Sequence, residues 1–245
     1  MSRLNNLAGK AAKRMGFTVM PTWRLQHYEA AEHLRHLFDL YKVDLVMDVG
    51  ANVGQYRDFL RLHVGYKGWI ASYEPVPEAY EKLLERSQDD TRWRVFQMAL
   101  GANHGTAMFN VSVASTLSSF HKPDFSESAH ASQKRQTLKE IEVAVDTVDR
   151  QLPGLLQALP AKRPYLKMDT QGYDLEVVRG SEQSLDQFVG LQFEGSVVPL
   201  YQGMPPFTTM LTSLNDRGFV LSDMFPVTKD RSLRLIEFDC VMVKN

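Results

Sequence analysis

Two glycines and several polar residues stand at the end of the first apolar run of the sequence, in LVMDVGANVGQY, residues 45–56. Gly50 and Gly54 allow the backbone to turn tightly and to approach a ligand closely. The dinucleotide fingerprint G-x-G-x-x-G is not met, because Asn52 fills its middle position and the last glycine comes one residue early. A P-loop is excluded as well, because Gln55 follows the second glycine where a P-loop has lysine.

Two acids near this loop favour a cationic ligand without phosphate. Asp48 stands two residues before Gly50, and Glu74 ends the next strand-like run, twenty positions after Gly54. An acid at the end of the second strand commonly binds ribose hydroxyls in nucleotide folds. The free N–H groups at the start of the helix near Gln55 suit a carboxylate. S-adenosylmethionine carries an ammonium and a sulfonium but no phosphate, so the spacing predicts this cofactor. A glycine-rich turn without a ligand is the alternative.

The elements that position these residues alternate between strands and helices. Strand-like runs are residues 45–49, 69–73, 95–99, 166–169 and 190–194, and helical runs include residues 28–41, 55–64, 77–88 and 173–179. This alternation predicts a doubly wound α/β fold with a parallel sheet.

The remaining segments predict an insertion and a closing hairpin. Residues 107–113 and 141–145 are predicted as strands that flank a polar segment, Ser115 to Lys139, which could lie over the site as a loop or short helix. Residues 218–222 and 235–243 predict an antiparallel hairpin at the end of the chain.

Length and composition fit one main domain, residues 43–245, preceded by a helical extension, residues 1–42. The 245 residues, 44% of them hydrophobic, suffice for one core. The net charge of −1 argues against a dedicated nucleic-acid binder. The single cysteine, Cys240, cannot form an intramolecular disulfide, and no run has the length of a membrane span or the pattern of a signal peptide. A cytoplasmic location is therefore expected.

The first residues predict a short basic amphipathic helix, from Leu4 to Met15, with Lys10, Lys13 and Arg14 on its polar side. Such a helix could touch a membrane surface weakly, or it could dock on its own domain or on the second subunit of a homodimer. No metal is expected: His27, His33 and His36 include one i, i+3 pair, but no acidic or cysteine-rich cluster accompanies it.

Three blocks together resemble the FkbM-like family of S-adenosylmethionine-dependent methyltransferases: MDVGANVGQY, YEPVPEAY and LKMDTQGYDLEVVRG, at residues 47–56, 73–80 and 166–180. The resemblance extends from about Asp44 to Val243. It implies a Rossmann-like class I methyltransferase sheet of seven strands, the last of them antiparallel. It also implies methyl transfer to oxygen atoms of sugars, lipid-linked glycans, polyketides or other natural products.

The resemblance assigns roles to matching positions. The cofactor loop is followed by Glu74 at the ribose, by the Met98-Ala99 edge beside adenine, and by Asp169 near the transferred methyl group. The expected cofactor-binding residues are Asp48, Gly50, Ala51, Asn52, Gly54, Gln55, Glu74, Pro75, Met98, Ala99 and Asp169. Gln171 departs from the D-x-E-G form of the family motif, and an amide cannot accept a proton as a carboxylate does.

Asp169 is the first candidate for a general base, because a carboxylate at the carboxyl end of a parallel strand faces the ligand crevice. The alternative is that it only orients the cofactor or the acceptor. His121 is the second candidate, since histidine titrates near neutrality, although the position of His121 in a polar loop favours a solvent-exposed histidine without a catalytic role. Gln171, Glu194 and Ser119 are expected to bind the substrate.

The sequence therefore predicts an S-adenosylmethionine-dependent O-methyltransferase. The resemblance implies that its acceptor is a hydroxyl, on a sugar of a glycan or glycolipid precursor or on a natural product. Two alternatives stay open. One is an N-methyltransferase of a small amine, and the other is an inactive partner subunit that binds the cofactor without turnover.

Overall fold

The computed structural model describes residues 14–17, 21–124 and 136–245. The predicted amphipathic helix from Leu4 to Met15 lies almost wholly outside these residues, as does much of the polar segment that follows residue 124. The proposed contacts of that helix with a membrane surface or a second subunit stay predictions. None of the helices in the described part of the chain combines the length and the apolar character that crossing a bilayer requires.

The core of the fold is a seven-stranded sheet with the order β3-β2-β1-β7-β8-β10-β9. Its strands are β1 (Leu45–Val49), β2 (Trp69–Tyr73), β3 (Trp93–Phe96), β7 (Pro164–Met168), β8 (Gly190–Ser196), β9 (Phe219–Lys229) and β10 (Leu235–Lys244). Strands β3, β2, β1, β7 and β8 pair in parallel, whereas β10 runs antiparallel to both β8 and β9. The predicted fold, with seven strands and an antiparallel last strand, is confirmed.

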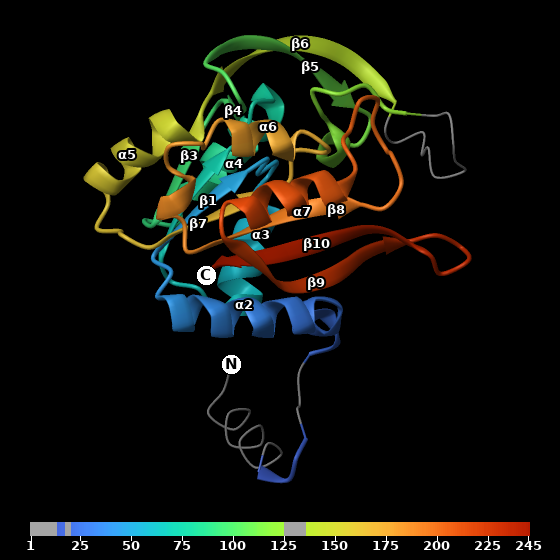
Figure 1. The fold of residues 1–245 in the computed structure, drawn as a ribbon. Helices are drawn as coiled ribbons and strands as arrows, with labels where there is room; N and C mark the ends of the chain where they lie inside the picture. Colours follow the sequence, from blue (N-terminus) through green and yellow to red (C-terminus); the bar gives the residue numbers. More distant parts are fainter. Residues whose placement is uncertain (1–13, 18–20, 125–135) are drawn as a thin grey trace.

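Helices of the described residues cover both faces of this sheet (Figure 1). The helices on one face are α2 (Tyr28–Tyr41), α3 (Gln55–Asp58) with its π-helical continuation η2 (Phe59–Val64), and α4 (Pro77–Ser87). Those on the other face are α5 (Val148–Ala158), α6 (Asp174–Arg179) and α7 (Phe207–Asp216). Two 3-10 turns, η1 (Thr22–His27) and η5 (Leu185–Gln187), complete these layers.

A second sheet, with the order β4-β6-β5, is built by the predicted insertion. It contains β4 (Ala99–Leu100), β5 (Gly105–Ser112) and β6 (Thr137–Asp146), and the short helix η3 (Ser115–Leu117) follows β5. The predicted strand over residues 95–99 is thus divided: its first residues continue β3, while Ala99 and Leu100 leave the main sheet to pair with the end of β6.

Helix α2 packs firmly on the sheet. Leu34, Leu37 and Phe38 are each at most 5% exposed, and the Phe38 ring lies 5.0 Å from the ring of Tyr165 in β7. This helix therefore shares a hydrophobic cluster with the main sheet. The division of the chain after residue 42 stays a prediction.

Candidate active site

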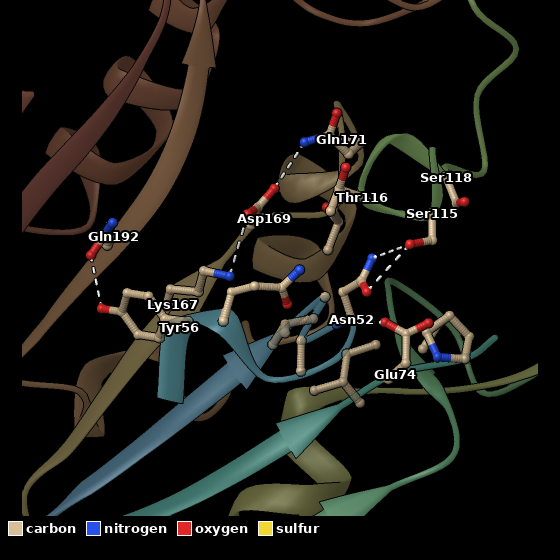
Figure 2. Close-up of a pocket in the computed structure, with 18 of the residues that line it drawn as sticks. Asn52, Tyr56, Glu74, Ser115, Thr116, Ser118, Lys167, Asp169, Gln171 and Gln192 are labelled. Atoms are coloured by element: carbon tan, nitrogen blue, oxygen red, sulfur yellow. Dashed lines mark hydrogen bonds and ion pairs between the residues drawn. The ribbon is translucent and has the colours of Figure 1, made fainter. Parts of the chain in front are cut away.

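A cavity of about 380 Å³ lies over the carboxyl ends of β1, β2 and β7, within the usual size of a small-molecule site. Figure 2 shows Glu74 on one side of it and Gln192 on the other, with Lys167 and Asp169 between them. Of the predicted cofactor residues, those that line the cavity are Gly50, Ala51, Asn52, Gln55, Glu74, Pro75, Ala99 and Asp169.

Gly50 brings the loop that follows β1, the predicted cofactor loop, against β7. Its φ is +82°, and a Cβ at this position would lie 2.1 Å from the backbone oxygen of Asp169, closer than any side-chain carbon could approach. The N–H groups of Gly50 and Ala51 donate to the Tyr73 carbonyl at 3.1 and 3.0 Å, which ties the same loop to β2. One loop thus places the ends of β2 and β7 around a single cavity.

The rest of the loop is shaped by packing and by a contact across the cavity mouth. Gly54 does not line the cavity: it has φ +90°, and a Cβ there would lie 2.7 Å from the Trp93 ring. Asn52 has φ +47°, and its Nδ2 donates to Ser115 Oγ at 3.1 Å. This contact joins the loop to η3, so the start of the polar segment lies beside the cavity (Figure 2).

Glu74 is a buried acid that faces this cavity. Its two carboxylate oxygens accept the N–H groups of Asn52 and Val76, each at 2.8 Å. Burial raises the pKa of Glu74 to about 7, against the lowering effect of these two hydrogen bonds. The fixed carboxylate retains lone pairs for neighbouring hydroxyl donors.

Apolar residues surround the Glu74 end of the cavity, and they suit a flat aromatic base. Pro75, Ala99, Leu100 and Phe109 form this wall. Met98 was predicted at the same edge but does not line the cavity, and instead it packs against the main hydrophobic core. Only the second residue of the predicted Met98-Ala99 pair therefore stands where a ligand could touch it.

Asp48 is fully buried below the cavity rather than on its wall. Its carboxylate forms an ion pair with Lys167 Nζ at 3.1 Å and accepts a hydrogen bond from Ser72 Oγ at 2.9 Å. Although burial alone would lower the pKa of Lys167, the carboxylates of Asp48 and Asp169 raise it above its ordinary value. The negative charge of Asp48 is thus already paired with Lys167 inside the protein. The geometry therefore disfavours a direct contact between Asp48 and the cofactor.

Asp169 stands on the cavity wall just beyond the end of β7, with its side chain 39% exposed. Its Oδ1 accepts a hydrogen bond from Gln171 Nε2 at 2.9 Å, and its Oδ2 lies 3.5 Å from Lys167 Nζ. Both oxygens are therefore held by donors from the two sides, while the carboxylate stays open to the cavity (Figure 2).

The three predicted substrate residues come together, but only Gln171 lines the main cavity. Ser119 Oγ donates to the Gln171 carbonyl at 2.7 Å, and Glu194 Oε2 accepts from Gln171 Nε2 at 2.7 Å. Ser119 and Glu194 thus bind Gln171 on the side that faces away from the cavity. His121 also lies outside the cavity: its ring centre is 5.6 Å from that of Tyr173, and partial burial lowers its pKa.

Several polar residues of the cavity were not predicted. Lys167, Gln192 and Asp239 line it from strands β7, β8 and β10, and Tyr56 on α3 donates through its hydroxyl to Gln192 Oε1 at 2.9 Å. Burial raises the pKa of Asp239 to about 6. The signal in the sequence was a polar residue inside each of three apolar strands. Among the described residues, no group of three or more His, Cys, Asp and Glu side chains is placed to hold a metal ion.

A sequence profile described as the methyltransferase FkbM domain matches residues 48–221, which is most of the chain. The chain belongs to the FkbM methyltransferase family. This FkbM protein is accordingly an S-adenosylmethionine-dependent methyltransferase. A comparison with curated proteins gave no match.

Solved structures provide likenesses to this FkbM chain in fold alone. An rRNA methylase from Streptococcus thermophilus is 12% identical with a TM-score of 0.47, and the match covers 89% of this chain and 96% of that one. A magnesium protoporphyrin IX methyltransferase from Synechocystis PCC 6803 with bound S-adenosylmethionine is 8% identical with a TM-score of 0.47, covering 95% and 89%. An S-adenosylmethionine-dependent methyltransferase from Aquifex aeolicus is 13% identical with a TM-score of 0.43, covering 96% and 98%.

Proposed function

We propose that this enzyme transfers a methyl group to a hydroxyl oxygen, on a sugar of a glycan or glycolipid precursor or on a natural product. The observation that carries the proposal is the Asp169 carboxylate, which is held on both oxygens by Gln171 and Lys167 yet is open to the cavity. A hydroxyl is a weak nucleophile and gains from a carboxylate in this position. The acceptor class itself rests on resemblance to the family.

The cavity offers a suitable place for the cofactor. Glu74 would accept hydrogen bonds from the ribose hydroxyls, the apolar wall of Pro75, Ala99 and Phe109 would contact adenine, and the loop around Gly50 would hold the methionine part. When bound, the cofactor supplies a methyl group that its sulfonium already activates. The protein then has to position the acceptor and accept the proton that its hydroxyl loses.

Asp169 is the group that would take that proton. It stands beyond the end of β7, between the Glu74 side of the cavity and the side lined by Gln192. A well-placed general base accelerates such a step roughly 10²–10⁴-fold. His121 is the weaker candidate, because its ring lies outside the cavity and would have to move to reach an acceptor there.

The end of the cavity away from Glu74 would receive the acceptor. Gln192 and Asp239 supply hydrogen-bonding groups there, and His27 and Ala30 come from η1 and α2. Asp239, His27 and Ala30 all lie outside residues 48–221, which match the family profile. These residues are therefore suited to set the acceptor preference of this particular chain.

The test is methyl transfer from isotopically labelled S-adenosylmethionine to a panel of glycosides, lipid-linked glycans and small amines. Asp169→Asn should lower transfer to a hydroxyl roughly 10²–10⁴-fold without weakening S-adenosylhomocysteine binding. Asp186→Asn, on an exposed side chain, is the matched control and should leave the rate unchanged. A methylated nitrogen as the only product, or full activity of Asp169→Asn, would contradict the proposal.

A further inference from the structure

Gln171 uses every polar atom of its side chain. Nε2 donates to Asp169 Oδ1 at 2.9 Å and to Glu194 Oε2 at 2.7 Å. Oε1 accepts from the Tyr201 hydroxyl at 2.7 Å. An amide nitrogen carries two hydrogens, so one hydrogen is available for each carboxylate. The amide is thus a neutral bridge between two acids from different strands.

The bridge is held firmly in place. Gln171 is 7% exposed, and Ser119 and Tyr201, which bind it, are 1% and 2% exposed. Its backbone adopts φ +54°, in the left-handed region, and Ser119 Oγ donates to its carbonyl at 2.7 Å. The side chain is therefore fixed at the backbone and at the amide oxygen, and it cannot turn away from the two acids without breaking these contacts.

A glutamate at position 171, as in the D-x-E-G form, would remove the donor that lies between two carboxylates. Asp169 and Glu194 approach the same nitrogen, so a carboxylate at position 171 would put three acids together without a donor between them. Burial, followed by the charge of Asp169, already raises the pKa of Glu194 well above its ordinary value. A third acid would add to that repulsion.

We infer that Gln171 is a positioning residue, whose amide holds the Asp169 carboxylate toward the acceptor and separates it from Glu194. Ser119 and Tyr201 fix the amide, and Glu194 anchors its second hydrogen. The catalytic part of this inference rests on the proposed function of Asp169. The bridge itself does not, because it follows from the hydrogen bonds alone.

The first test measures the unfolding midpoint between pH 5 and 8 for the wild type and for Gln171→Glu. At low pH one of the three neighbouring carboxyl groups, at positions 169, 171 and 194, can carry a proton and restore one hydrogen bond. The unfolding midpoint of the variant should then lie near that of the wild type. As pH rises, these carboxyl groups lose that proton, and the midpoint of the variant should fall progressively below that of the wild type. Gln187→Glu, on an exposed side chain, adds the same charge elsewhere and should show no such trend. A Gln171→Glu midpoint equal to that of the wild type at pH 8 would overturn the inference.

A second variant separates positioning from mere stability. Gln171→Glu/Glu194→Gln restores the number of charges and one amide, so the loss of stability at pH 8 should largely disappear. Asp169 would now face a carboxylate instead of a donor. We therefore expect its side chain to be displaced in a crystal structure of the double variant, and kcat to stay at least tenfold low on any hydroxyl acceptor that the wild type methylates.

The two proposals fail in distinguishable ways. A wild-type Asp169 position and full kcat in the double variant would show that Gln171 has no positioning role. An absence of hydroxyl methylation by the wild type would refute the proposed function, while the midpoints and the Asp169 position would still decide whether the amide bridges the two acids.

Discussion

At the scale of single residues, the site depends on buried acids whose protonation is set by their surroundings. Glu74 is the clearest case, because two backbone N–H groups fix its carboxylate at the edge of the cavity. Burial nevertheless raises its pKa to about 7. The residue that we propose to bind ribose therefore changes charge near neutral pH.

Cofactor affinity should consequently depend on Glu74 and on pH. If only the ionised carboxylate binds the ribose hydroxyls well, affinity for S-adenosylhomocysteine should fall about tenfold between pH 8 and pH 6. Calorimetric titration at several pH values measures this. Glu74→Gln should bind more weakly at pH 8 and lose that part of the pH dependence. An unchanged pH dependence in Glu74→Gln would assign the effect to another group.

The same residue should affect folding stability with a defined sign. A carboxyl group whose pKa is raised on folding binds more protons in the folded state than in the unfolded one. Its contribution is therefore most favourable below the unfolded value of 4.5 and is lost as pH rises toward about 7. Unfolding midpoints from pH 5 to 8 should fall less steeply in Glu74→Gln than in the wild type. An identical slope would exclude the raised pKa.

The residue types in the sequence were sufficient to predict part of this site, but they did not predict the ion pair between Asp48 and Lys167. The spacing of Gly50 and Glu74 was sufficient to predict a loop and an acid that face one cavity, and cofactor binding by these residues stays a prediction. Asp48 was expected as a ligand for positive charge, but its partner, Lys167, comes 119 residues later. Nothing local in the sequence indicates that pair. It follows from the register of β1 beside β7, in which Asp48 is opposite Lys167.

At the scale of elements, the close approach of the cofactor loop to β7 can be isolated with two glycines. Gly50 and Gly65 have similar positive φ values of +82° and +79°, but a Cβ at Gly65 meets nothing within 4 Å. Gly65→Ala should therefore cost only the conformational penalty, about 1–2 kcal/mol of unfolding free energy.

Gly50→Ala should lower the free energy of unfolding by more than Gly65→Ala, because its Cβ would also collide with the Asp169 carbonyl. It should also weaken S-adenosylhomocysteine binding, whereas Gly65→Ala should not. Chemical denaturation and calorimetry on the two variants measure both effects. Equal losses of stability in the two variants would mean that the loop does not need to lie so close to β7.

Strands and helices were predicted correctly where a single hydrophobic pattern ran through the segment without interruption. Strands β1 and β2 have the predicted bounds because each is a short apolar run with clear ends. Helix α5 was not predicted, since Pro153 stands inside it, and proline normally interrupts a helix. Helix α7 was missed too: it follows Pro205 and Pro206 and contains several residues with low helix propensity. Tertiary packing decides both helices.

At the scale of the whole molecule, α2 extends the fold beyond the part that the family profile matches. Phe38→Ala should lower the free energy of unfolding by about 3–5 kcal/mol, because a buried ring leaves a cavity. Leu40→Ala on the same helix is the control: Leu40 is 73% exposed, so the change should stay within about 0.5 kcal/mol. Similar small effects from both substitutions would show that residues 1–42 form a separable extension.

The central claim is that one cavity, from Glu74 to Asp169, binds the cofactor and presents its reactive end to the acceptor. A crystal structure of the complex with S-adenosylhomocysteine tests this claim most directly. We expect the ribose hydroxyls within hydrogen-bond distance of the Glu74 carboxylate, and the sulfur directed toward the part of the cavity that Asp169 and Gln192 line. A nucleoside bound elsewhere, or one turned so that its sulfur points away from Asp169, would contradict the account.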